Sequence, residues 1–227
     1  MNIKIRQLSS LDKVFQQNRR MNYEISNARV LKGERFSYQL EIQSDVSRSV
    51  SVAVQPELCE NITMYQEGFA YCDLPTFAAA SKAAADADYL TFEPCLIPDI
   101  LTPLSRQNNR IRISRDKCLL WIRVDIPRNV KCGTYPVTVI LTADGETLKE
   151  THLELEVLPY ELPENTVKYT QWFYSDCIAN VHGVKVYSEE HWKLIEEYIK
   201  TAADCGINMI LTPVHNPPLD TAVGATR

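Results

Sequence analysis

Residues 153–163 read LELEVLPYELP, and this stretch divides the chain into two parts of different character. Apolar and polar residues alternate up to Val157, which is typical of a half-buried β-strand. Pro159 and Pro163 follow, and proline both lacks the N–H that a sheet needs and stiffens a linker. The stretch therefore predicts a domain over residues 1–158, a linker over 159–163 and a second region over 164–227.

Upstream of this stretch, from about Asn22 to Val157, short alternating runs are separated by Gly, Asn, Asp and Pro. Such runs are typical of antiparallel strands that place one face on a core. The clearest are Phe36–Ile42, Val50–Val54, Leu120–Ile126, Tyr135–Leu141 and Leu153–Val157. We therefore expect a mainly β protein whose first domain is an antiparallel β-sandwich.

Two local features refine this sandwich. Asp144-Gly145 lies between two alternating runs and predicts a tight hairpin turn. From Asp73 to Leu104 the alternation is broken by an alanine cluster over residues 78–85 and then by several prolines. We expect this segment to leave the sandwich, with at most a helical turn or two.

Downstream of the prolines, residues 169–174 and 208–214 are continuous strand-like runs, as in strands of a parallel sheet that are buried on both faces. Between them, Ser188 can cap a helix whose C-terminal end is expected at Gly206. This order of strand, helix and strand predicts one β-α-β unit.

That unit is too short to be a domain. The second region holds 64 residues, from Glu164 to Arg227, whereas a (β/α)8 barrel takes roughly 250 residues. Its strands would also leave apolar surface uncovered. We therefore expect an incomplete protein: a sandwich followed by the truncated start of a (β/α)8 barrel.

Composition narrows the possible functions. The net charge is -5 without a basic run, which argues against nucleic acid as a partner. No long apolar segment and no secretory leader are apparent, so we expect a cytoplasmic protein without a membrane partner. The seven cysteines include no C-x-x-C pair, so we expect neither a disulfide framework, nor a metal, nor a cofactor.

Several stretches resemble glycoside hydrolase family 123, the β-N-acetylgalactosaminidase-like enzymes, and a larger group of bacterial proteins with the same layout of sandwich and barrel. In the first domain the similar stretches are Lys32-Gly33-Glu34, Pro98-Asp99-Ile100-Leu101 and Gly133-Thr134-Tyr135. In the second region they are residues 171–176 and residues 208–221. The resemblance spans nearly the whole chain.

The resemblance implies hydrolysis of glycans that contain N-acetylhexosamine. In that family the 2-acetamido group of the sugar attacks the anomeric carbon, while an adjacent Asp-Glu pair orients it and protonates the leaving oxygen. No Asp-Glu dipeptide occurs in this sequence. We therefore expect no catalytic residues here, and a chain that is inactive by itself.

Substrate-binding residues are expected where the two barrel strands end, because function in such barrels sits at the C-terminal ends of the strands. Each candidate also has a structural interpretation: an aromatic residue in the core, an acid that caps a loop, or a histidine satisfied inside the fold. Ser175 is a further rim residue. The sugar-binding candidates are Trp172, Tyr174, Asp176, His215 and Asp220.

Three functions stay open from the sequence. The first is the N-terminal fragment of a glycoside hydrolase-like protein, whose partner is the glycan substrate of the full-length enzyme. The second is a carbohydrate-binding or interaction module whose barrel is completed by a partner chain, because sandwich folds host many functions. The third is a hydrolase relative that uses other acids. His182 and His191 are interpreted as surface residues.

Overall fold

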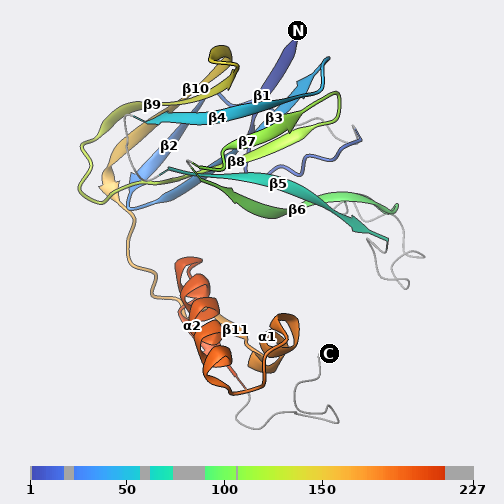
Figure 1. Cartoon of the computed structure of the whole chain (residues 1–227). Helices are drawn as coiled ribbons and strands as arrows, with labels where there is room; N and C mark the ends of the chain where they lie inside the picture. Colours follow the sequence, from blue (N-terminus) through green and yellow to red (C-terminus); the bar gives the residue numbers. More distant parts are fainter. Residues whose placement is uncertain (1, 18–22, 57–61, 74–89, 106, 213–227) are drawn as a thin grey trace. The chain divides into compact units, whose positions relative to one another are not determined.

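The computed structural model describes residues 2–17, 23–56, 62–73, 90–105 and 107–212 (Figure 1). The chain divides into two compact units, Met1–Pro163 and Glu164–Arg227. Three sequence predictions, the alanine cluster over residues 78–85 and the rim residues His215 and Asp220, lie outside the described residues.

The first unit contains two five-stranded sheets (Figure 1). One sheet has the order β1-β3-β8-β5-β6 and the other β2-β10-β9-β4-β7. The strand bounds are β1 Ile3–Ser9, β2 Asn27–Lys32, β3 Arg35–Ser44, β4 Arg48–Pro56, β5 Ile62–Cys72, β6 Cys95–Leu104, β7 Arg110–Ile113, β8 Cys118–Asp125, β9 Gly133–Ala143 and β10 Glu146–Glu161.

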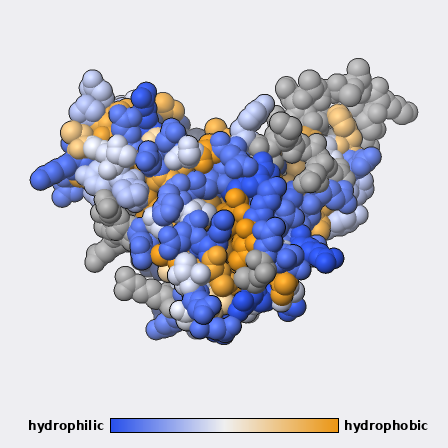
Figure 2. All heavy atoms as spheres, turned by 90° about the horizontal axis from the view of Figure 1, so that it is seen from above, coloured by the Kyte–Doolittle hydropathy of each residue, from blue (hydrophilic) through white to orange (hydrophobic). Residues whose placement is uncertain are grey.

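One hydrophobic core takes residues from both sheets. The alternation seen in the sequence places Leu120, Ile122 and Val124 of β8 in this core, together with Val139 of β9 and Leu155 of β10. Burial of a large aliphatic side chain is worth about 1.5–3 kcal/mol. Hydrophilic residues cover most of the face shown in Figure 2. The expectation of a mainly β protein is confirmed.

Most strand pairs are antiparallel, and the predicted hairpin joins β9 to β10. Asp144 and Gly145 have φ values of 53° and 83°, the left-handed values that a tight two-residue turn requires. One pair differs from the all-antiparallel expectation: β2 runs parallel to β10 along residues 154–157.

The prolines near residue 160 do not end the sheet, which corrects the sequence analysis. Strand β10 continues to Glu161, which pairs with Lys32, and the Leu162 N–H donates to the Lys32 carbonyl. Pro159 falls where the register shifts between Val157 and Glu161, so its missing N–H interrupts no regular ladder. The predicted linker 159–163 therefore overlaps the strand.

A second correction concerns residues 95–104, which we expected to leave the sheet. They form β6, which pairs with β5 at the edge of the first sheet. Pro98 and Pro103 are tolerated because one side of an edge strand needs no hydrogen-bond donors. Proline content alone therefore gave the wrong answer.

The outer side of the first sheet carries a buried polar cluster under residues 9–17. The Gln39 side chain donates to the carbonyls of Ser9 and Asp12 at 2.8 Å each. Lys117 donates its ammonium to the Phe15 carbonyl at 2.6 Å, and it lies 3.8 Å from Glu41. These bonds hold the segment against the sheet.

Glu67, on β5, lies at the same side and predicts a pH effect. Burial raises the pKa of its carboxyl, and the charge of Lys13 only partly opposes this. An acid whose pKa is raised by folding favours the neutral form, so folding stability falls as pH rises above its ordinary pKa. The stability of Glu67→Gln minus that of the wild type should therefore increase from about pH 4 to about pH 8. Urea unfolding at both pH values measures this, and an unchanged difference would contradict it.

The second unit contains β11 (Thr170–Trp172), α1 (Ser175–His182), α2 (Glu189–Asp204) and β12 (Met209–Leu211). The two strands pair in parallel, with Gln171 opposite Ile210. Two helices connect them where the sequence predicted one. Gly183 ends α1 with a φ of 65°, so a C-cap glycine was the overlooked signal.

Helix α2 matches its prediction closely. Ser188 is its N-cap, and the hydroxyl accepts from the His191 N–H at 3.3 Å. Gly206 follows the helix with a φ of 89°. Glu190 in the first turn has a lowered pKa because its own backbone N–H and the Ser188 hydroxyl donate to its carboxylate.

Removing this cap gives a second prediction. Ser188→Ala should destabilise α2 by about 1 kcal/mol, because one N–H at the helix start loses its acceptor. Hydrogen exchange of the α2 amides measures the loss. Thr201→Ala on the same helix is the control: Thr201 only bonds back to the Glu197 carbonyl, so alanine should be neutral or slightly stabilising.

Candidate functional site

The candidate site lies at the C-terminal end of β11, where the chain passes into α1. Asn208 fixes the start of the neighbouring strand: its Oδ1 accepts from the Tyr169 N–H at 2.8 Å and its Nδ2 donates to the Val167 carbonyl at 2.8 Å. The Phe173 N–H donates to the Leu211 carbonyl at 2.8 Å, which extends the pairing beyond β11. These bonds keep β11 and β12 in register at both their N-terminal and their C-terminal ends.

Two aromatic rings stack at this end. Trp172 and Tyr174 have ring centroids 5.9 Å apart and an interplanar angle of 8°. Trp172 is 65% exposed, so it is not a core residue of the described chain. Because alternate residues of a strand point to the same side, this spacing brings the two rings together. The pair offers a flat apolar surface beside polar groups.

Asp176 lies in the first turn of α1 and is only 3% exposed. Its Oδ1 has no hydrogen-bond partner among the described residues. The helix start favours a negative charge at this position. Tyr174, and not Asp176, is the N-cap residue. The oxygen keeps unused acceptor capacity, but a ligand donor reaches it only after the side chains that cover it move.

His191 is the residue that the sequence analysis missed. It is fully buried, so its interpretation as a surface residue is wrong. Nδ1 accepts from the Tyr187 N–H at 2.8 Å, and Nε2 donates to the Ser175 carbonyl at 2.7 Å. Both partners require the neutral ring with its proton on Nε2. His191 thereby ties the start of α2 to the residue before Asp176.

Tyr187 completes the support of this rim. Its φ of 60° is unusual for a residue other than glycine. Its ring packs on Trp192 at 5.8 Å and on His191 at 5.8 Å. Such backbone strain persists only where the surroundings impose it. The spacing of Ser188 and His191 at the helix start was the one sequence signal for this arrangement.

The second unit has one further histidine among its described residues. His182 is exposed and its Nε2 lies 3.0 Å from the Tyr198 hydroxyl. Within the described part of the chain, no three His, Cys, Asp or Glu side chains are placed to hold a metal ion. Neither of the two described helices has the length and apolar content needed to cross a membrane.

The structure stacks two of the predicted residues, Trp172 and Tyr174, at one strand end, and it places Asp176 in the first turn of the helix that follows. His215 and Asp220 lie outside the described residues. The arrangement can stack on an apolar ring face and accept a hydrogen bond. An adjacent Asp-Glu pair is absent from the sequence.

A family model begins at this strand end. Residues 172–226 match the glycoside hydrolase 123 catalytic domain. The matched segment starts at Trp172, the last residue of β11, and includes α1, α2 and β12. The resemblance to family 123 is confirmed.

A solved structure of a family 123 glycoside hydrolase from Clostridium perfringens, described for glycolipid glycan hydrolysis, has the same fold. It matches with 18% identity and a TM-score of 0.69 over 91% of this chain. The match takes in 37% of that protein, so this chain spans about a third of its length. No curated protein matches the chain.

Other matches are too weak to argue from. The N-terminal domain of PorA matches with 10% identity and a TM-score of 0.32, over 69% of this chain and 99% of its own. AvmM, which catalyses macrocyclization in alchivemycin A biosynthesis, matches with 7% identity and a TM-score of 0.35, over 73% and 93%. Family 123 is the resemblance that the family model and the fold match support.

Proposed function

We propose that this chain corresponds to the first part of a glycoside hydrolase-like protein that acts on glycans containing N-acetylhexosamine. In this proposal residues 1–158 are a β-sandwich, residues 159–163 a linker, and residues 164–227 the opening of a (β/α)8 barrel. One observation carries it: the match to the family 123 catalytic domain begins at the strand end that bears the stacked rings of Trp172 and Tyr174.

The strand end supplies the contacts that a sugar ring requires. Aromatic faces pack against the apolar C–H face of a sugar, and the exposed Trp172 offers such a face. Once its cover opens, the Oδ1 of Asp176, which is without a partner among the described residues, can accept from a hydroxyl or an acetamido N–H. In the proposed roles Trp172 and Tyr174 form the platform and Asp176 orients the sugar. His215 and Asp220 are proposed to contribute from the end of the second strand.

The proposed chemistry belongs to the complete enzyme. There the 2-acetamido group of the substrate attacks the anomeric carbon, and an adjacent Asp-Glu pair assists. Because this sequence contains no such pair, we propose that the chain binds but does not cleave by itself. An assay with an aryl N-acetylgalactosaminide should show no release of the aglycone. Release at a rate typical of such enzymes would overturn the proposal.

Binding at the rim is tested by the three tryptophans, Trp121, Trp172 and Trp192. In a ¹⁵N-labelled chain, addition of N-acetylgalactosamine should shift the indole N–H signal of Trp172 and leave that of Trp121 in place. Trp172→Ala should weaken binding by about five- to tenfold, the equivalent of one aromatic contact. A shift confined to Trp121 would move the site to the first unit and contradict the proposed rim.

A separate variant tests whether the Asp176 carboxylate binds the sugar. Asp176→Asn keeps the size of the side chain but replaces one acceptor oxygen with a donor group. We expect weaker sugar binding and an unchanged Trp172–Tyr174 stack, read from the indole signal of the free protein. If Asp176→Asn binds as wild type does, the carboxylate has a structural role at the helix start.

A second candidate is a carbohydrate-binding or interaction module whose barrel is completed by a partner chain. The observation that favours it is the exposure of Trp172, Met209 and Leu211 on the two paired strands. Exposed apolar strand surface of this kind marks an interaction site or drives association. Co-purification of a second polypeptide that carries further barrel strands would support this candidate. Aggregation of the isolated chain without a partner would contradict it.

A further inference from the structure

Two cysteines lie opposite one another where β5 and β6 meet the segment that joins them. Cys72 is the last residue of β5 and Cys95 the first of β6, and the two are direct partners in the antiparallel ladder. The strands run side by side in Figure 1. Both thiols are free. Their pairing follows from register and was not visible in the spacing of the cysteines along the sequence.

The register is suited to a covalent bond. Directly opposite residues of an antiparallel pair have Cα atoms about 4.5–5.5 Å apart and side chains on the same face. A disulfide accepts Cα separations of about 4.4–6.8 Å. The preceding pairs, Tyr71 with Leu96 and Ala70 with Ile97, keep the same register. The backbone therefore already has the separation that a cross-strand disulfide requires.

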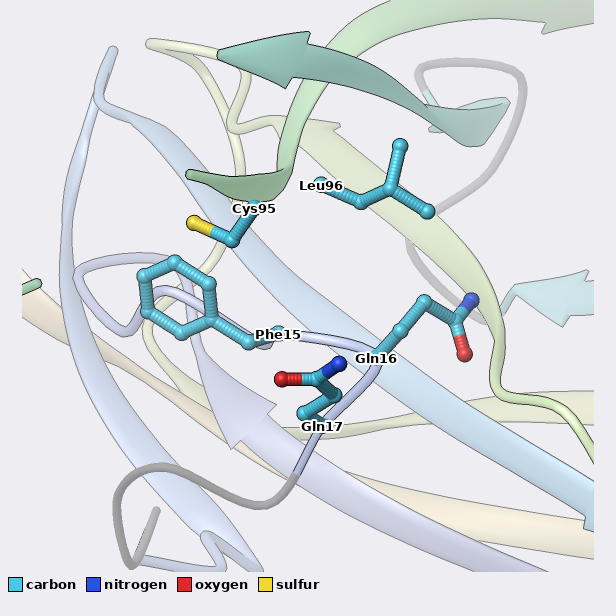
Figure 3. A pocket seen from close by; sticks show the side chains of 5 residues that line it. All are labelled: Phe15, Gln16, Gln17, Cys95 and Leu96. Atoms are coloured by element: carbon cyan, nitrogen blue, oxygen red, sulfur yellow. The ribbon is translucent and has the colours of Figure 1, made fainter. Parts of the chain in front are cut away.

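The two thiols differ in access. Cys72 is partly exposed, whereas Cys95 is 8% exposed and lines a small cavity with Phe15 and Leu96 (Figure 3). That cavity has a volume of about 50 Å³, far below the roughly 300–1,000 Å³ of small-molecule pockets. A soluble disulfide built from two tripeptides therefore reaches Cys72 and not Cys95.

We propose that Cys72 and Cys95 form a redox couple that closes to a cross-strand disulfide. The oxidant is a small-molecule disulfide of the glutathione class. The Cys72 thiolate attacks one sulfur of the oxidant, which releases one glutathione thiol and leaves a mixed disulfide. The Cys95 thiolate then attacks the Cys72 sulfur and releases the second. Two protein thiols lose two electrons and two protons, and the oxidant becomes two thiols.

The bond would close a covalent ring over residues 72–95 at the edge of the first sheet. Among the described residues, β6 is an edge strand of its sheet and β5 is its one neighbour. A link at the end of the pair would keep β6 in register even when its hydrogen bonds open. Edge strands are the positions where pairing with another chain begins. Oxidation would therefore keep β6 from detaching and leaving β5 as a new edge.

Other thiols in the described chain lack this arrangement. Cys118 is buried in the core, and burial raises the pKa of its thiol to about 11, so it has little nucleophilic thiolate at neutral pH. Cys132 and Cys205 are exposed. They can take up glutathione, but neither occupies a ladder position opposite another cysteine. Cys132 therefore serves as a matched control.

The test is a peptide map of the oxidised full chain. Trypsin cuts after Arg48, Lys82 and Arg106, so Cys72 lies in peptide 49–82 and Cys95 in peptide 83–106. Because Cys59 shares the first peptide, the map is made with the Cys59→Ser variant. After exposure to oxidised glutathione, the two peptides should stay joined without reductant and separate when it is added.

Single variants identify the order of events. Made in the Cys59→Ser background, Cys95→Ser should stop at the mixed disulfide, so peptide 49–82 should carry one glutathione, on Cys72. Cys72→Ser should leave peptide 83–106 unmodified, because Cys95 is shielded. Cys132→Ser should leave the link between the two peptides intact. Separate peptides in the Cys59→Ser variant after oxidation, or a link from Cys95 to any cysteine other than Cys72, would overturn the proposal.

Discussion

Leu120→Ala should lower the free energy of unfolding of the first unit by about 2–5 kcal/mol. Leu120 is fully buried on β8, the central strand of its sheet, between Leu40 on β3 and Gln66 on β5. Truncation to alanine removes apolar contacts and leaves a cavity that close-packed neighbours fill only in part. Because domains are stable by only about 5–15 kcal/mol, this loss is a large share of the total.

Urea unfolding followed by tryptophan fluorescence measures this effect. Leu11→Ala is the matched control, because Leu11 is 92% exposed and the same truncation there removes almost no buried surface. A loss below about 1 kcal/mol for Leu120→Ala, or equal losses for the two variants, would contradict the packing of β8 at the centre of the core.

Lys117→Met should cost about 2–3 kcal/mol, because it removes the charge from the polar cluster under residues 9–17. The Phe15 carbonyl loses its 2.6 Å donor, and Glu41, 4% exposed, loses one of its two nearby cations. Arg6 stays 3.5 Å from that carboxylate and limits the damage. Methionine keeps the length of the stem and its packing, so the loss reports chiefly on the charge.

The comparison variant is Lys4→Met, which makes the same replacement at an exposed position of β1 and should be nearly neutral. Addition of Glu41→Leu to Lys117→Met should recover part of the loss, since the carboxylate that lacked a partner is then gone as well. Strictly additive losses would mean that the two charges do not interact at 3.8 Å.

Local sequence patterns predicted the strands that have one buried and one exposed face, and also the elements marked by turn or cap residues. The alternation of Leu120, Ile122 and Val124 and the turn at Asp144-Gly145 were sufficient to predict β8 and the β9–β10 hairpin. Helix α2 followed from its cap residues. In each of these elements, neighbours in the chain determine the structure. Fold class was accordingly predictable, although no local pattern could show which strands become neighbours in a sheet.

The sequence predictions that were wrong share a cause: the place of a residue in the folded structure overrode the preference of the local sequence. Pro98 and Pro159 suggested chain breaks, yet an edge and a register shift accommodate them. The parallel pair of β2 and β10 joins residues more than a hundred positions apart, and sequence spacing does not encode it. Burial of His191 depends on where the Ser175 carbonyl lies, which is likewise a tertiary fact.

The long β10 strand has a mechanical consequence. It continues four residues beyond Val157, where its pairing with β9 ends, and the second unit begins in the sequence at Glu164, shortly after the strand ends. A pull transmitted along the chain from that unit would act lengthwise on β10. Its bonds to β2 and β9 lie across the direction of such a force, so they would share the tension and yield together. The end of β10 therefore acts as an anchor that resists shear.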